Sequence, residues 1–289
     1  MVVLSATSCG VVDLTKYSYY SPGPAFKEGY RQEGIVEEVV QPCSVPGPTE
    51  RRMIVYLPPD YYQDTTKRYP VFYLLHGARG YETSWIRKGR VYESTDSLFR
   101  NGLAIPCIVV MPNVNQYNND KDYDGGRFKD AYESILEVDG IVESAFVHDV
   151  VEFTDSLYRT IPDKDHRAVA GLSIGGYQSI FFGANHPDTF GYIGAMSPYM
   201  WCMGWPNKYW RQFYTGRDSK FKVQFQDPPK GYYLFAGKWD MMRPSTVNFH
   251  KYLRRNRFPH TYVRFSGSHD WKNGWIDEYV YMLERVFRD

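Results

Sequence analysis

A single serine lies in a glycine-rich segment whose spacing suits nucleophilic chemistry. Gly171, Ser173 and Gly175 fit the pattern G-x-S-x-G, which is typical of a nucleophile elbow. In such an elbow a tight turn between a strand and a helix lifts the serine hydroxyl above the edge of a sheet, and the glycines allow the two elements to pass closely. Residues 167–172 suit the strand and residues 174–184 suit the helix. A glycine-rich turn that carries an ordinary serine is the alternative.

A histidine partner is required, because a serine hydroxyl becomes nucleophilic only when an imidazole takes its proton and a carboxylate orients that imidazole. With this elbow the acid and then the histidine follow the serine in the chain, each in a loop after a later strand. His269 follows the last predicted strand and is the predicted general base. The other histidines after the serine lie near a helix end, inside a helix pattern or ahead of a strand, at His186, His250 and His260.

Asp240 is the predicted acid of this arrangement. It ends the segment 237–240, which directly follows a predicted strand at 232–236. Asp270 is the second candidate. It is adjacent to His269 in sequence, but an extended backbone would point the two side chains apart. We therefore expect Asp240 to orient His269.

Two backbone N–H groups are the predicted oxyanion donors. Acyl transfer develops negative charge on an oxygen, which is stabilised by one donor just after the nucleophile and one from the loop after an early strand. Ile174 follows the serine, and Ala78 lies in the loop that begins with His76 and Gly77. We expect His76 to fix this loop by hydrogen bonding rather than to transfer protons.

Strand and helix patterns around these residues predict an α/β fold with a mostly parallel central sheet and helices on both faces. Two segments, 34–41 and 51–57, are predicted to form antiparallel strands joined by a turn. Further strands are expected at 69–75, 104–111, 167–172, 192–196, 232–236 and 261–265, and helices at 144–159, 174–184 and 245–257. The helix at 144–159 should place four apolar residues on one face, Phe146, Val150, Phe153 and Leu157.

A single domain at 34–289 is predicted, preceded by an extended arm at residues 1–33. The segment 199–229 interrupts the strand and helix alternation and is rich in aromatic residues. It is either a cap over the site or a small satellite core.

Composition and charge exclude several classes of partner. The formal net charge of +1 gives no general attraction to nucleic acid or to an anionic membrane. No apolar run approaches the roughly 20 residues that span a bilayer. Aromatic residues make up 17% of the chain, with 26 tyrosines and 7 tryptophans, so we expect some to line a binding surface for a sugar or phenolic ring.

No metal site and no cofactor is predicted. Asp120, Asp122, Asp124 and Gly125 fit the first half of a calcium-binding loop, but Ala131 stands where a glutamate is needed, so a solvated turn is favoured. The four cysteines are Cys9, Cys43, Cys107 and Cys202. They are widely spaced and form no C-x-x-C pair, so a disulfide is neither predicted nor excluded. Cys107 falls in an apolar strand and is expected to be a buried thiol.

Four motifs together resemble the esterase D-like α/β-hydrolases and, within them, the first carbohydrate esterase family of feruloyl and acetylxylan esterases. They are Leu74–Gly77, Met111–Asn113, His166–Gly176 and Gly267–Asp270, and the resemblance covers about residue 34 to the C-terminus. It implies an α/β-hydrolase fold and a cofactor-free serine esterase. It also implies the same triad and the same oxyanion donors as the residues themselves. Ser268 departs from the pattern, because many relatives have glycine there.

The resemblance implies hydrolysis of an ester that joins ferulate or a related hydroxycinnamate to plant cell-wall arabinoxylan. Acetylxylan, a siderophore ester or S-formylglutathione are alternative substrates, and a catalytically silent, carbohydrate-binding hydrolase scaffold is the non-enzymatic alternative. The partner would be a feruloylated or acetylated plant polysaccharide or oligosaccharide. Five residues in or near the loops after strand ends are the expected substrate contacts, namely Trp85, Asn113, Tyr199, Trp201 and Trp239.

The resemblance also implies a secreted or periplasmic protein. The first residues lack the basic segment and the full apolar segment of a signal peptide. The sequence does not indicate an oligomeric state.

Overall fold

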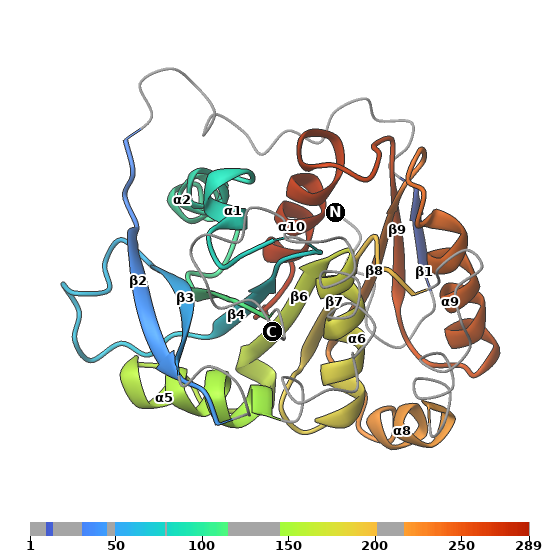
Figure 1. The fold of residues 1–289 in the computed structure, drawn as a ribbon, viewed down its shortest axis with the longest axis horizontal. Helices are drawn as coiled ribbons and strands as arrows, with labels where there is room; N and C mark the ends of the chain where they lie inside the picture. The colour runs from blue at the N-terminus through green and yellow to red at the C-terminus, as the bar shows by residue number, and fades with distance from the viewer. Residues whose placement is uncertain are drawn as a thin grey trace.

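The computed structural model describes residues 10–13, 31–44, 50–78, 80–114, 145–200 and 217–288. These residues form a nine-stranded sheet with the order β1-β9-β8-β7-β6-β4-β5-β3-β2 (Figure 1). The strands are β1 Gly10–Asp13, β2 Ile35–Pro42, β3 Glu50–Leu57, β4 Val71–Leu75, β5 Ile108–Pro112, β6 Arg167–Leu172, β7 Tyr192–Met196, β8 Gly231–Gly237 and β9 Thr261–Phe265.

The sheet is mostly parallel, as the strand and helix patterns predict. β2 pairs antiparallel with β3, and β3 pairs antiparallel with β5, while every other pairing in the sheet is parallel. β4, β5, β6 and β7 are buried at every position, because helices cover both faces of the sheet. The predicted α/β-hydrolase fold is therefore confirmed.

The helices lie on the two faces of the sheet (Figure 1). Val71, Tyr73 and Leu75 of β4 contribute to one core with residues of α5, α6, α8 and α9, whereas Phe72 and Leu74 contribute to the opposite core with residues of α1, α2 and α10. The helices are α1 Ser84–Arg87, α2 Val91–Arg100, α5 Phe153–Leu157, α6 Ile174–Asn185, α8 Arg217–Gln224, α9 Arg243–Arg255 and α10 Ile276–Leu283. Short 3₁₀ or π-helical segments are η2 Val147–Glu152, η3 Lys164–His166 and η4 Trp271–Trp275.

Two elements differ from the sequence-based expectations. The strand expected at 104–111 begins only at Ile108, because Pro106 has no N–H to donate to a neighbouring strand. Leu157, expected on the buried face of its helix, is 51% exposed. The cause is η2, whose π-helical hydrogen bonds change the residue spacing, so that positions four, three and four apart no longer share one face.

The N-terminal arm contributes a strand that differs from the extended arm predicted for residues 1–33. β1 pairs in parallel with β9, from Gly10 opposite Thr261 to Asp13 opposite Arg264, at one edge of the sheet. The rest of the arm before Arg31 lies outside the described residues.

Of the aromatic-rich insertion the structure describes residues 199–200 and 217–229, and α8 begins at Arg217. Phe221 of α8 is buried, with its ring near those of Phe249 and Phe258, at centroid distances of 5.6 Å and 6.4 Å. α8 lies beside α6 and contributes to the core on that face. This half of the insertion therefore supports the small-core alternative, while residues 201–216 lie outside the described part.

The structure describes only part of the residues that bear on a membrane span, a metal site or a disulfide. Within those ranges, no helix is both long and apolar enough to span a bilayer, and no three His, Cys, Asp or Glu side chains are grouped so that they could bind a metal ion. The acidic loop at 120–131 lies outside them, as do Cys9 and Cys202. Cys43 is a free thiol, and Cys107 is a free and buried one.

Candidate active site

Ser173 occupies a strained turn between β6 and α6. Its φ is 55° and its ψ is −112°, a backbone conformation that a non-glycine residue adopts only when its surroundings hold it there. A Cβ atom on Gly175 would lie 2.4 Å from the carbonyl oxygen of His76, and one on Gly171 would lie 2.5 Å from the carbonyl carbon of Gly175. Only glycine fits at these two positions, which explains the G-x-S-x-G spacing.

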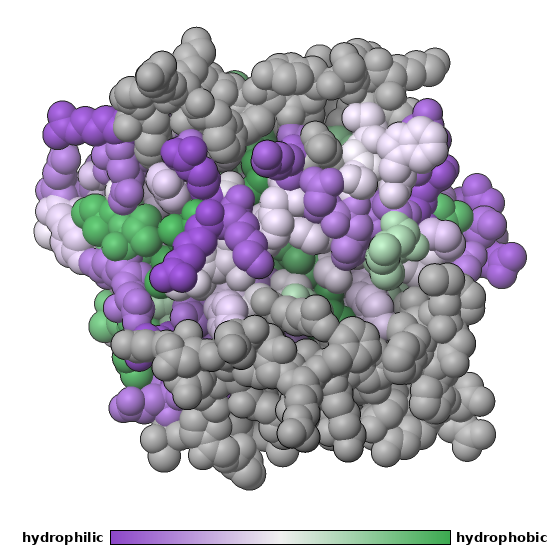
Figure 2. All heavy atoms as spheres, turned by 45° about the horizontal axis from the view of Figure 1, so that its top comes forward, coloured by the Kyte–Doolittle hydropathy of each residue, from purple (hydrophilic) through white to green (hydrophobic). Residues whose placement is uncertain are grey.

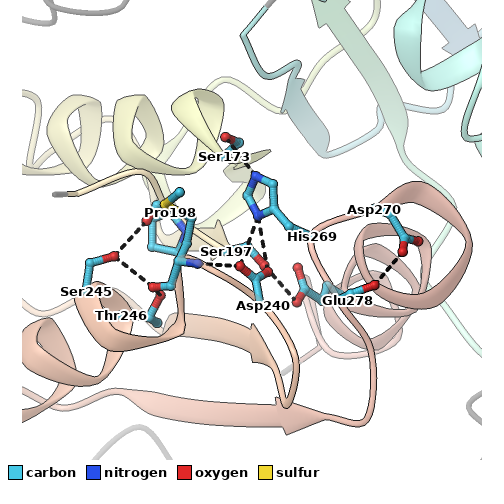
Figure 3. Close-up of polar contacts among 11 residues, drawn as sticks. Ser173, Ser197, Pro198, Asp240, Ser245, Thr246, His269, Asp270 and Glu278 are labelled. Atoms are coloured by element: carbon cyan, nitrogen blue, oxygen red, sulfur yellow. Dashed lines mark hydrogen bonds and ion pairs between the residues drawn. The ribbon is translucent and has the colours of Figure 1, made fainter. Parts of the chain in front are cut away.

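The structure brings Ser173, His269 and Asp240 into one hydrogen-bonded chain (Figure 3). Ser173 Oγ lies 3.2 Å from His269 Nε2, and His269 Nδ1 lies 3.1 Å and 3.2 Å from the two carboxylate oxygens of Asp240. The three residues follow β6, β9 and β8, whose carboxyl ends meet at one edge of the parallel sheet. The arrangement is the one expected from the sequence.

The protonation of His269 follows from its two neighbours. The Asp240 side chain is fully buried and also accepts a hydrogen bond from the Met242 N–H at 2.6 Å. Because Asp240 accepts the Nδ1 proton, the Nε2 lone pair of neutral His269 faces the serine hydroxyl. Asp270 instead accepts from Ser268 Oγ at 2.5 Å and from the Lys272 N–H at 2.9 Å, and it points away from the imidazole (Figure 3).

His76 fixes the loop after β4 beside the nucleophile. Its Nδ1–H donates to the Gly77 carbonyl at 2.8 Å and its Nε2 accepts from the Val114 N–H at 3.1 Å, which requires a neutral ring with the proton on Nδ1. Burial lowers the pKa of His76 to about 4, so the ring is neutral at neutral pH. A Cβ on Gly77 would lie 3.3 Å from Ser173 Cβ, so the loop that continues to Ala78 passes directly beside the nucleophile.

Ile174 is the first residue of α6, where a backbone N–H has no acceptor within the helix. This N–H and that of Ala78 therefore remain the predicted oxyanion donors.

Residues 46–286 match the family model described as "Putative esterase". The match covers most of the chain, including the strands and loops that carry Ser173, Asp240 and His269. The chain belongs to this esterase family.

One relative is named as a feruloyl esterase. The chain is 30% identical over 198 residues to an endo-1,4-beta-xylanase/feruloyl esterase of Xylanibacter ruminicola, a match that covers 67% of this chain and 23% of that protein. The chain thus spans about a quarter of the length of this relative.

Ferulic acid esterases are among the solved structures that share the fold. A ferulic acid esterase is 24% identical, with a TM-score of 0.69 over 88% of this chain and 97% of its own. A CE1 ferulic acid esterase from the anaerobic fungus Anaeromyces mucronatus is 22% identical, with a TM-score of 0.73 over 91% of this chain and 94% of its own. The latter protein has also been solved in complex with ferulic acid.

Of the five substrate contacts expected in the esterase, Trp85 is contradicted by the structure. Its side chain is fully buried, and its indole N–H donates to the Leu75 carbonyl at 3.0 Å. It belongs to the hydrophobic core on the face of α2 and α10. Trp201 lies outside the described residues.

The other three expected contacts lie near the site in different ways. Asn113 is buried and donates to Glu82 at 3.1 Å, so it supports the loop that holds His76. The N–H of Tyr199 donates to the Ser173 carbonyl at 2.9 Å, which places this residue beside the nucleophile. Trp239 precedes Asp240 and is 72% exposed.

A tryptophan ring packs against His269 with a second tryptophan behind it, and neither is among the predicted site residues. The ring of Trp275 meets that of His269 edge to face, with centroids 4.9 Å apart, and Trp271 in turn lies 5.2 Å from Trp275 and 5.0 Å from Trp85. Trp275 therefore packs against the imidazole of the base, and Trp271 packs against Trp275. Trp271 and Trp275 follow His269 by two and six residues. This closeness in sequence is the signal by which they could have been predicted as site residues.

Proposed function

We propose that this esterase hydrolyses esters of ferulate or related hydroxycinnamates in plant cell-wall arabinoxylan through an acyl-enzyme at Ser173. The observation that carries the chemistry is the hydrogen-bonded chain from Ser173 through His269 to Asp240. The acyl preference is supported by the names of the relatives, and the exposed ring of Trp239 beside Asp240 offers a surface for a phenolic or sugar ring.

In the first half-reaction Ser173 Oγ attacks the ester carbonyl while His269 Nε2 takes the hydroxyl proton. The resulting oxyanion accepts hydrogen bonds from the N–H groups of Ile174 and Ala78. The intermediate collapses when the C–O bond to the sugar breaks, and the imidazolium gives its proton to the leaving alcohol. Asp240 stabilises the imidazolium without taking its proton.

In the second half-reaction a water molecule replaces the sugar alcohol. His269 takes a proton from the water as the water attacks the acyl-enzyme, and then returns a proton to Ser173 Oγ as that bond breaks. The products are the free carboxylic acid and the regenerated serine.

The proposal is tested by measuring hydrolysis of methyl ferulate and of acetylated xylan side by side, with wild-type protein and with Ser173→Ala. Wild-type protein is expected to prefer methyl ferulate, and the alanine variant to lose turnover of both while it keeps the wild-type unfolding temperature. Turnover of methyl ferulate by the alanine variant at the wild-type rate contradicts the mechanism. A higher kcat/KM on acetylated xylan contradicts the acyl preference and leaves the serine mechanism intact.

A small-acyl esterase is the second candidate, because the fold is shared with an S-formylglutathione hydrolase of Staphylococcus aureus that is 17% identical, with a TM-score of 0.63. S-formylglutathione and a siderophore ester therefore belong in the same ester panel. Polysaccharide binding without hydrolysis of any of these esters would instead support the non-enzymatic alternative. An arabinoxylan substrate further leads us to propose that the protein acts outside the cytoplasm.

A further inference from the structure

Glu278 is a fully buried carboxylic acid close behind the triad. It lies in α10, none of its surface is exposed, and its side chain points toward Ser197 and Asp240 (Figure 3). Its Oε1 atom accepts a hydrogen bond from Ser197 Oγ at 3.4 Å, and among the described residues its Oε2 atom has no hydrogen-bond partner. Burial of a carboxyl group with a single long hydrogen bond destabilises the folded state, so packing alone does not account for this residue.

Ser197 connects Glu278 to the nucleophile. It directly follows β7, is buried, and has a φ of 48°, in the left-handed region that favours glycine. Its N–H donates to the Phe235 carbonyl in β8 at 3.0 Å, and two residues later the N–H of Tyr199 donates to the Ser173 carbonyl at 2.9 Å. A strained backbone persists only where its surroundings hold it. The hydrogen bond to Glu278 is one of the contacts that hold this segment.

The groups around Glu278 indicate that its carboxyl group is protonated and uncharged. Within the described part of the chain the groups near its carboxyl are uncharged or acidic: Ser197, Asp240 from the loop after β8, and Asp277 from α10. Asp240 carries the negative charge of this region, because its oxygens accept from His269 and from the Met242 N–H. Burial, followed by the charges of Asp240 and Asp277, raises the pKa of Glu278 well above its usual value.

We propose that Glu278 is a positioning residue for the triad: its uncharged carboxyl group holds Ser197 and packs behind Asp240, and thereby fixes both the segment beside Ser173 and the acid that orients His269. This role rests on the esterase chemistry proposed above. An ionised carboxyl in this place would add a second negative charge and raise the basicity of His269, whereas a neutral one orients its neighbours and leaves the charge with Asp240.

The test compares Glu278→Gln, Glu278→Ala and wild-type protein. The measurements are kcat and KM on 4-nitrophenyl acetate, the pH dependence of kcat/KM, and the rate at which a fluorophosphonate labels Ser173. Glu278→Ala is expected to lower kcat and the labelling rate by about tenfold or more with KM within about twofold, because a small displacement of the reacting groups slows the reaction strongly. Glu278→Gln keeps the size and neutrality of the side chain and should restore most of this loss, with the acid limb of the pH profile at the wild-type position.

Glu93 of α2 supplies the matched control, since its side chain is also fully buried. Glu93→Ala should lower the unfolding temperature without changing the pH profile or the labelling rate per folded molecule. The proposal is overturned if Glu278→Ala keeps the wild-type labelling rate, or if Glu278→Gln moves the acid limb to lower pH by half a unit or more, which would mean that Glu278 is ionised. Labelling does not depend on which ester is hydrolysed, so a failure of the feruloyl preference stays distinguishable from a failure of this proposal.

Discussion

The two carboxylate oxygens of Asp240 lie at nearly equal distances from His269 Nδ1, 3.1 Å and 3.2 Å. This symmetrical contact holds the imidazole plane and leaves one tautomer, with the proton on Nδ1 and the lone pair on Nε2. Because Asp240 is fully buried, no solvent competes for this hydrogen bond. Asp240 therefore orients the base.

Replacement of Asp240 by asparagine should lower kcat by about 10⁴-fold, because an amide favours the wrong imidazole tautomer. The fold should survive, since asparagine has the same shape. The measurement is kcat on 4-nitrophenyl acetate at several pH values. Asp270→Asn is the matched control and should keep kcat within about threefold, because its carboxylate faces away from His269 (Figure 3). An equal loss in both variants would contradict the assignment of the acid.

Gly175→Ala should damage both stability and activity. The added methyl would lie 2.4 Å from the His76 carbonyl oxygen and 2.8 Å from that of Leu75, and backbone atoms cannot yield easily. We expect the free energy of unfolding to fall by about 1–3 kcal/mol and kcat to fall by about 10²-fold as the elbow shifts. Urea unfolding and ester hydrolysis measure the two effects.

Gly102→Ala is the control for this change. Gly102 has a φ of 64°, and no atom lies within 4 Å of the place where its Cβ would stand. Gly102→Ala should lower the free energy of unfolding by about 1 kcal/mol through backbone strain alone, and kcat should not change. If the two alanines acted alike on kcat, close contact would not be the reason for glycine in the elbow.

Stability should fall as the pH is lowered from about 6.5 toward 4, in part because of His76. The unfolded chain binds a proton on this histidine below its usual pKa of about 6.5, whereas burial keeps the folded pKa at about 4. The unfolded state therefore binds more protons in this interval, and the free energy of unfolding decreases with decreasing pH, by about 2 kcal/mol between pH 7 and pH 5 for this one group. His76→Gln should show a correspondingly smaller decrease in urea unfolding at the two pH values.

His250 titrates in the same interval, since burial and the neighbouring His260 lower its pKa to about 4. The comparison must therefore be made between variants and not from the wild-type curve alone. An identical pH dependence in wild type and His76→Gln would contradict the buried, neutral state of His76.

Replacement by alanine should affect substrate binding at Trp239 and stability at Trp85. Figure 2 shows that hydrophilic residues make up most of the described surface on the face it displays, with apolar residues in small separate patches. Two large side chains next to Asp240 in sequence are nevertheless exposed. Trp239 is 72% exposed and Met241 is 70% exposed. Trp239→Ala should change stability by less than about 0.5 kcal/mol and raise KM for methyl ferulate several-fold more than KM for 4-nitrophenyl acetate.

Trp85→Ala should instead lower the free energy of unfolding by about 3–5 kcal/mol, because it empties a fully buried position. Thermal unfolding and the ratio of the two KM values separate the two effects. Equal KM changes on both esters for Trp239→Ala would argue against contact of this ring with the substrate.

The sheet and the order of its catalytic loops could be predicted from sequence because each depends on local patterns. The strands that carry Ser173, Asp240 and His269 are short segments rich in apolar residues, and a parallel sheet brings their carboxyl ends to one edge. Three such strands, each followed by a loop with a polar residue, were therefore enough to place the candidate site.

Features that depend on distant contacts could not be predicted. β1 is four residues long and pairs with a strand about 250 residues away, so no local pattern identifies it. Trp85 looks like a loop residue in sequence, and only the packing of α1 shows that it is buried. Glu278 lies in an ordinary amphipathic pattern at the end of the chain, and its closeness to Asp240 follows from the position of α10 on the sheet.

The edge position of β1 has a consequence for how the protein can be shortened. A chain cut at residue 33, where the sequence pattern alone would place the domain boundary, would lose the strand that shields β9. The backbone N–H and C=O groups of β9 would then be open to pairing with another chain. Because His269 follows β9 by four residues, self-association at this edge would occur beside the general base, and loss of activity on truncation would be a matter of aggregation rather than of catalysis.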